Sequence, residues 1–179
     1  MEDLKRQQGL SPAVFVLKKA KIDQGMTTMT QGILGADVLV QIGIVVKDIE
    51  KTAKDYAEFF GVEVPQIIET DEWEKAHTEY NGHPTKARAK LVFFKNFKNI
   101  EIELIQPNEN PSTWREFLDK HGEGIHHVAI LVKNMDEKLE SLKKIGIGVL
   151  QKGDYEGGRY AYVNSVEKLK FILELLENY

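Results

Sequence analysis

The sequence predicts an α+β fold in which two tandem βαβββ modules pair into a curved, open half-barrel. Three observations favour it: short apolar segments of strand type alternate with amphipathic helical segments, this order occurs twice, and the two copies align. VQIGIVVKDI, which begins at residue 40, aligns with HHVAILVKNM, which begins at residue 126. Since one such sheet cannot bury both of its faces alone, the two copies are expected to pair.

The composition excludes several classes of protein. The chain has 179 residues and a net charge of −4, and a non-specific nucleic-acid binder needs a basic face instead. No apolar run approaches the roughly 18–20 residues that span a bilayer, and the opening residues lack the apolar core of a signal peptide. Cysteine is absent, which rules out disulfides and thiolate sites. We therefore expect a cytoplasmic protein without nucleic-acid or membrane partners.

Four segments are expected along the chain. Residues 1–36 form an N-terminal extension, because MTTMTQGILG has neither helical nor strand periodicity, and one short helix is expected around residues 11–21. Residues 37–111 form the first module. Residues 112–123 form a linking helix, and residues 124–179 form the second module.

The first module opens with a buried strand over residues 38–46, which is rich in β-branched side chains. The amphipathic helix over residues 49–60 begins after Asp48, a residue type that caps helices, and ends at Gly61. A strand over residues 62–69, a long polar loop over 71–86 and two strands over 87–94 and 100–107 complete the module.

A proline and two helix-capping residues refine the expected strands and helices. Pro65 moves its strand toward a sheet edge, because proline cannot donate to a hydrogen-bond ladder. Ser112 and Asn134 are expected to cap the linking helix and the helix of the second module. The second module repeats the first as a strand over 124–132, a helix over 135–146 and strands over 147–152, 159–164 and 169–177.

Four polar residues interrupt these strands at equivalent positions. Gln41 and His127 lie on the opening strands of the two modules, and Glu103 and Glu174 lie on the closing strands. Because alternate side chains of a strand share a face, a pseudo-twofold axis between the modules would bring the four together. By the same alternation His126 is expected on the opposite face, in a structural role.

One imidazole, two carboxylates and one amide oxygen form a mixed nitrogen–oxygen set that suits Zn²⁺, Ni²⁺, Co²⁺, Mn²⁺ or Fe²⁺. Each of these residues alone is more often a solvated or structural side chain, and their equivalent placement in both modules is what favours a shared site. We therefore expect one divalent ion at Gln41, Glu103, His127 and Glu174. Glu101 is expected to share the face of Glu103, where it is either a solvated edge glutamate or a second acid–base group beside the site.

The sequence blocks that hold these residues resemble the vicinal oxygen chelate superfamily, which includes glyoxalase I, methylmalonyl-CoA epimerase, extradiol dioxygenases and bleomycin-resistance proteins. The blocks are QIGIVVKDIEKTAKDYAEFFG, GEGIHHVAILVKNM and GGRYAYVNSVEKLKFILELLE. The resemblance implies the same half-barrel and places metal ligands at positions 41, 103, 127 and 174. This Gln, Glu, His, Glu set is similar to that of zinc-type glyoxalase I.

The resemblance implies a glyoxalase-I-like lyase or isomerase that moves the proton beside the carbonyl of a small α-hydroxy or α-keto compound, with a thioester as one option. Glu174, or secondly Glu103, would be the catalytic base. An epimerase-like racemase is the first alternative, because STWREFLDKHGEGIHHVAI resembles that branch. Its usual set is His, Gln, His, Glu, and its glutamate near the third strand has no counterpart in NGHPTKARAK.

A non-catalytic binding protein of the bleomycin-resistance kind is the alternative from another functional class. It uses the same fold without needing four converging ligands. A homodimer is expected in each case.

Overall fold

Ten strands form one continuous sheet, and both halves of the chain contribute to its centre. The computed structural model describes residues 32–35 and 39–179. The short helix expected around residues 11–21 lies outside the described residues, as does the N-terminal extension apart from residues 32–35.

The elements follow the order that the repeat predicts. The first half holds β1 (Leu39–Val45), α1 (Ile49–Phe60), β2 (Ile68–Glu69), α2 (Trp73–Ala76), β3 (Glu79–Tyr80), β4 (His83–Pro84), β5 (Ala89–Phe94) and β6 (Glu101–Pro107). The rest holds α3 (Thr113–His121), β7 (Gly124–Leu131), α4 (Met135–Lys144), β8 (Val149–Tyr155), β9 (Gly158–Val163), α5 (Val166–Leu169) and β10 (Ile172–Asn178).

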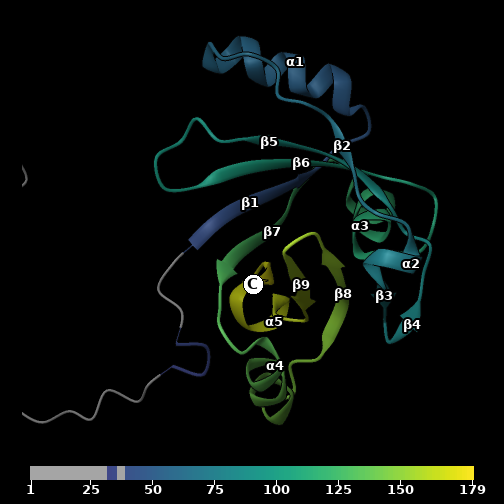
Figure 1. Ribbon diagram of the computed structural model, residues 1–179, viewed down its shortest axis with the longest axis vertical. Coiled ribbons are helices and arrows are strands. Elements are labelled where there is room, and N and C mark those ends of the chain that lie inside the picture. The colour runs from purple at the N-terminus through teal and green to yellow at the C-terminus, as the bar shows by residue number, and fades with distance from the viewer. Residues whose placement is uncertain (1–31, 36–38) are drawn as a thin grey trace, which may run out of the picture. The chain divides into compact units, whose positions relative to one another are not determined.

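The strand order is β2-β5-β6-β1-β7-β10-β9-β8-β3-β4 (Figure 1). Each module pairs its first and last strands in parallel, β1 with β6 and β7 with β10. The modules join through the antiparallel pair β1 and β7, so the centre of the sheet is the symmetric set β6-β1-β7-β10. This arrangement confirms the predicted fold of two βαβββ modules in a curled, open half-barrel.

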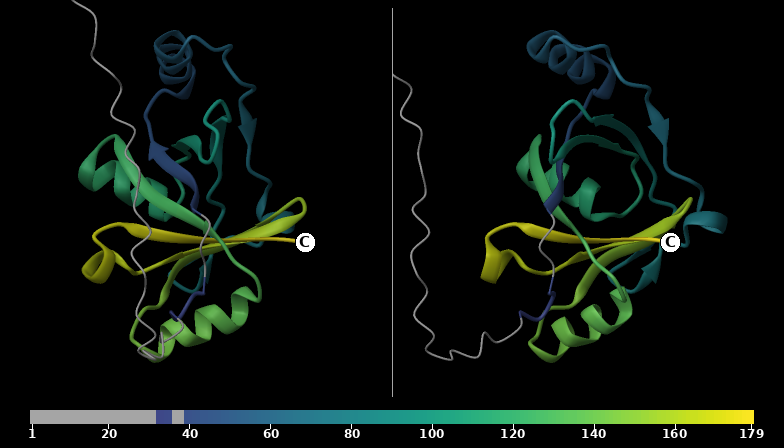
Figure 2. Two further views of the ribbon diagram at one scale, coloured as in Figure 1. Left: turned by 90° about the vertical axis from the view of Figure 1, so that its left-hand side faces the viewer. Right: turned by 60° about the vertical axis from the view of Figure 1, so that its left-hand side comes forward.

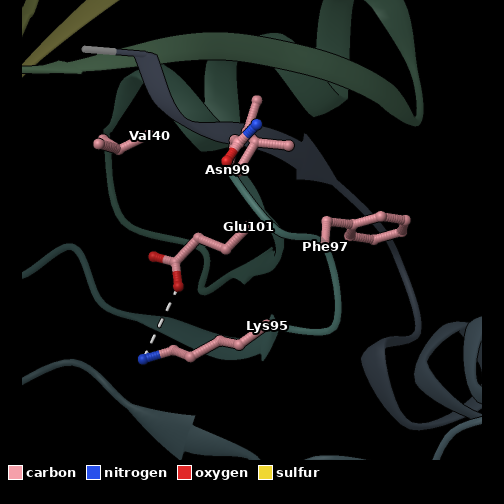
Figure 3. A pocket seen from close by; sticks show the side chains of 6 residues that line it. Val40, Lys95, Phe97, Asn99 and Glu101 are labelled. Carbon is pink, nitrogen blue, oxygen red and sulfur yellow. Dashed lines mark ion pairs between the residues drawn. The ribbon is translucent and has the colours of Figure 1, made fainter.

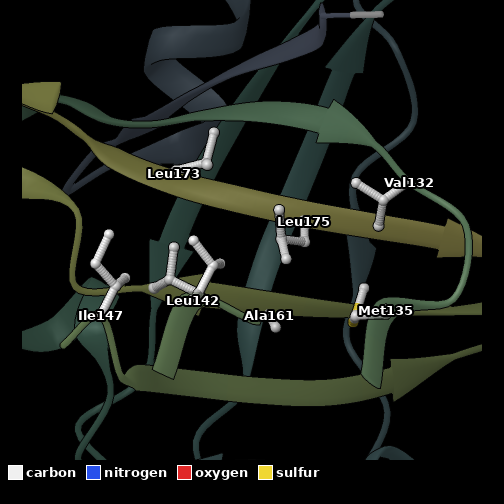
Figure 4. Packing of buried hydrophobic residues seen from close by; sticks show 8 residues of the cluster. Val132, Met135, Leu142, Ile147, Ala161, Leu173 and Leu175 are labelled. Carbon is white, nitrogen blue, oxygen red and sulfur yellow. The ribbon is translucent and has the colours of Figure 1, made fainter. Parts of the chain in front are cut away.

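The helices α1 and α4 cover the outer face of the sheet, one over each module (Figure 2). Val46 and Leu104 pack with α1, and the equivalent residues Val132 and Leu175 pack with α4. Figure 4 shows how Leu175 lies among the apolar side chains of the second module. The linking helix α3 packs on the opposite face through Trp114, so that face carries the third apolar cluster.

Three local predictions were wrong or incomplete. The strand over residues 62–69 shrinks to the two residues of β2, because Pro65 has no N–H to offer a ladder. The loop over residues 71–86 holds α2 and a small hairpin, and β3 of that hairpin pairs with β8 at the edge of the second module. The last strand starts at Ile172, after α5.

Within the part of the chain that the structure describes, no helix is long and apolar enough to cross a membrane.

The two module helices differ in how their predicted N-cap residues act. Asp48 caps α1 as predicted, accepting from the Lys51 backbone N–H at 2.9 Å, and Gly61 ends the helix in a left-handed conformation. Asn134 occupies the equivalent position of α4, but its side chain makes no capping hydrogen bond.

In each module, a side chain on the last strand accepts a hydrogen bond from the first backbone N–H of the helix. Gln106 Oε1 on β6 accepts from the first N–H of α1, on Ile49, at 2.9 Å. Glu177 Oε1 on β10 accepts from the first N–H of α4, on Met135, at 3.1 Å. Because Ile49 and Met135 are buried, these acceptors satisfy donors that water reaches poorly.

Replacing Gln106 with leucine tests this capping. Gln106→Leu leaves the buried Ile49 N–H without its acceptor, and we expect it to lower the free energy of unfolding by about 1–3 kcal/mol. Gln106→Glu keeps an acceptor oxygen and serves as the control. Urea denaturation measures both variants, and equal stability of Gln106→Leu and the wild type would contradict this role.

Candidate metal centre

The four predicted ligands lie on the four central strands of the sheet. Gln41 is on β1, Glu103 on β6, His127 on β7 and Glu174 on β10. All four residues are buried, with exposed fractions from 0 to 7%. One chain supplies the whole set, so its assembly does not depend on a second copy of the protein.

Two small residues at equivalent positions make room for the set. Gly43 lies between Glu103 on β6 and His127 on β7 in the strand register. Ala129 lies between Glu174 on β10 and Gln41 on β1. A Cβ at position 43 would lie 2.0 Å from His127 Cε1, so the imidazole occupies the space that the glycine leaves open.

The side chains converge on one ring nitrogen. His127 Nε2 is 3.0 Å from Glu174 Oε2, 3.4 Å from Gln41 Oε1 and 3.5 Å from Glu103 Oε2. Ligand atoms that each lie about 2.0–2.2 Å from one ion are separated from each other by roughly 3.0–3.5 Å. The observed separations from Nε2 therefore fit a shared ion.

The hydrogen bonding leaves one of the four side chains incompletely satisfied. Glu174 Oε2 is buried and has no hydrogen-bond partner among the described residues, despite its proximity to His127. Within residues 32–35 and 39–179, no group of three or more His, Asp or Glu side chains meets the geometry of a metal site. The three contacts of His127 Nε2 are therefore what supports a candidate centre here.

The electrostatics show what such a cation would change. Burial, followed by the charges of Glu174 and Glu101, raises the pKa of Glu103 well above its usual value. Burial raises the pKa of Glu174 to about 8 and lowers the pKa of His127 to about 3. Without a positive charge nearby, burial therefore favours the neutral forms of all three groups.

Aromatic side chains that sequence reasoning missed enclose the centre. Tyr162 on β9 is the register partner of Glu174, and its ring centroid lies 4.9 Å from that of His127. Its hydroxyl accepts from Trp114 Nε1 at 3.0 Å. The sequence did hold a signal for these side chains, because Tyr160 and Tyr162 are two residues apart on one strand and so are expected to share a face.

Glu101 connects the buried set to the surface. Its Oε1 accepts from Gln41 Nε2 at 3.3 Å, and its Oε2 lies 3.7 Å from Lys95 Nζ. Glu101 and Lys95 line a cavity of about 320 Å³, together with Val40, Phe97, Asn99 and Ile100 (Figure 3). The contact with Gln41 was not predicted, since the sequence placed Glu101 only beside Glu103.

A family model described as Glyoxalase/Bleomycin resistance protein/Dioxygenase superfamily matches residues 40–163. This match covers most of the chain and includes three of the four converging side chains. The chain belongs to this superfamily. The human mitochondrial methylmalonyl-CoA epimerase is 25% identical to it over 136 residues, which are 75% of this chain and 69% of the human protein.

Solved structures of superfamily members agree with the fold. The methylmalonyl-CoA epimerase from Mycobacterium tuberculosis has a TM-score of 0.55 and 21% identity, covering 86% of this chain and 94% of that one. A methylmalonyl-CoA epimerase in complex with methylmalonyl-CoA and NH₄⁺ has a TM-score of 0.57 and 21% identity, covering 80% and 95%. At this level of identity the likeness supports the superfamily fold alone.

The close approach at Gly43 makes a sharp test of the centre. In Gly43→Ala the new methyl group would collide with the His127 ring, so we expect His127 to move, at a cost of about 1–3 kcal/mol in stability. The rise in melting temperature on adding Zn²⁺, expected for the wild type, should shrink or vanish in this variant.

Gly148→Ala is the matched control, because a Cβ there meets no atom within 4 Å. Thermal unfolding with and without Zn²⁺ compares the two variants. A Gly43→Ala protein that matches the wild type in both stability and Zn²⁺ response would show that the imidazole does not need this gap.

Proposed function

We propose that the chain is a divalent-metal-dependent isomerase that moves the proton beside the carbonyl of an acyl thioester, in the manner of a methylmalonyl-CoA epimerase. The observation that carries the proposal is the convergence of two buried acids, Glu103 and Glu174, on the same imidazole nitrogen. The epimerase relatives favour this function over the glyoxalase-I-like one, which was our first expectation from the ligand types.

The donor set supports a resident ion at Gln41, Glu103, His127 and Glu174, since nitrogen and oxygen donors converge and one carboxylate oxygen lacks a partner. A divalent ion there would withdraw electron density from a carbonyl oxygen and so favour loss of the adjacent proton. The identity of that ion among Zn²⁺, Ni²⁺, Co²⁺, Mn²⁺ and Fe²⁺ is left open.

The two acids suit a reaction that inverts a carbon centre. Inversion needs one group to take a proton from one side of the carbon and another to return a proton to the other side. Glu103 and Glu174 come from opposite modules, and the pseudo-twofold relation would place them on opposite sides of a substrate between them. Either carboxylate, when it is not bound to the ion, could take or return the proton.

This assignment also accounts for the departures from the epimerase pattern. The usual set has glutamine where this chain has Glu103, and a separate glutamate near the third strand that is absent from NGHPTKARAK. We infer that Glu103 supplies the second carboxylate which the third strand lacks. Glu101, which is 28% exposed at its side chain, would let protons exchange between solvent and the buried acids.

Deuterium incorporation tests the proposal. Zn²⁺- or Co²⁺-loaded protein is incubated with methylmalonyl-CoA in D₂O, and mass spectrometry follows deuterium at the α-carbon. We expect metal-dependent exchange that Glu103→Gln and Glu174→Gln each slow by about 100-fold or more, because each removes one proton-transfer group. Glu101→Gln should slow exchange less.

The controls separate the alternatives. Exchange with a glutathione hemithioacetal in place of methylmalonyl-CoA would favour the glyoxalase-like function. Ion binding without exchange into either compound would favour a binding protein. Unchanged turnover in Glu101→Gln would remove Glu101 from the mechanism.

A further inference from the structure

The strand β7 carries a bulge at the predicted ligand. In the pairing of β1 with β7, Gly43 lies opposite His127, and the next residue, Ile44, lies opposite Ile125. His126 therefore has no partner across the ladder. A bulge of this kind interrupts strict alternation, so two successive side chains can point to the same side.

Contacts of the two rings show that they do. The His126 and His127 ring centroids lie 5.1 Å and 4.9 Å from that of Tyr162. His126 also packs edge-on against Phe117 of α3 and is only 2% exposed. The expectation that His126 lies on the opposite face from His127 is therefore wrong, and the bulge is the reason.

The two imidazole rings meet at the same ring atom, Nδ1. His126 Nδ1 lies 3.1 Å from His127 Nδ1, which is hydrogen-bond distance. Only one of two nitrogens so placed carries the proton between them, because two N–H groups would repel. If His127 is to offer the Nε2 lone pair to an ion, its own proton must be on Nδ1.

We propose that His126 is a positioning residue that accepts a hydrogen bond from His127 Nδ1–H and so keeps the Nε2 lone pair of His127 facing the three ligand oxygens. The inference rests on the proposed metal site. Ligating histidines commonly donate their other N–H to a partner that fixes their orientation, and here the partner is the preceding residue in the chain.

The surroundings of His126 agree with this direction. An accepting Nδ1 requires the proton of neutral His126 to be on Nε2. Nε2 of His126 is buried and has no hydrogen-bond partner among the described residues, so no donor to Nε2 favours the opposite tautomer.

Two variants at position 126 test the proposal. His126→Leu removes the acceptor, whereas the Oδ1 of His126→Asn can replace Nδ1. His121→Leu is the matched control, because His121 also packs against Phe117 but is not among the contacts of His127. Ring ¹⁵N spectra report the tautomer of His127 with and without Zn²⁺, and titration reports Zn²⁺ affinity. Backbone spectra establish folding.

We expect His127 to be in the Nδ1–H form in the wild type, in the control and in His126→Asn. His126→Leu should show a mixture of tautomers and bind Zn²⁺ about 10- to 100-fold more weakly. Wild-type tautomer and affinity in His126→Leu would overturn the proposal, as would equal losses in both variants, which indicate packing alone. If His126→Leu does not fold, His126→Phe replaces it.

The outcome separates this inference from the proposed function. A wild-type protein that binds no ion removes the metal-dependent function. The metal-free spectra still decide the role of His126: an identical His127 tautomer in the wild type and in the acceptor-free variant overturns it.

Discussion

Two carboxyl groups and an imidazole are buried together at the seam of the sheet, and this electrostatic constraint shapes the rest of the structure. Burial favours the neutral forms of Glu103, Glu174 and His127, and the described residues place no cationic side chain among them. Buried ionisable groups are tolerated when they are paired or bind a metal. In the proposed function, a divalent ion would supply the positive charge that balances the two carboxylates.

The pseudo-twofold relation between the modules explains how one repeated sequence pattern can assemble such a site. One strand–helix pattern, used twice, places a candidate ligand on each opening strand and each closing strand. Gly43 and Ala129 occupy equivalent positions and keep the centre of the sheet open for the ligands. Gln106 and Glu177 cap the two helices in the same symmetric way, so the scaffold and the site follow one symmetry.

Much of the fold and the candidate site could be predicted because both depend on short-range periodicity. The helix over Ile49–Phe60 follows from its apolar spacing, and the convergence of Gln41 and His127 follows from alternation along repeated strands. The predicted sheet face of the His126 side chain was wrong, because a bulge is a backbone feature that the residue types do not indicate. Trp114 and Tyr162 were missed, because their contact joins elements far apart in the chain.

Anomalous diffraction from crystals grown with Co²⁺ or Zn²⁺ tests the central claim most directly. The account predicts one strong peak about 2.0–2.2 Å from His127 Nε2, with oxygens of Gln41, Glu103 and Glu174 completing the ligand set. A peak bound by other side chains, or no peak at these four under saturating metal, would contradict it.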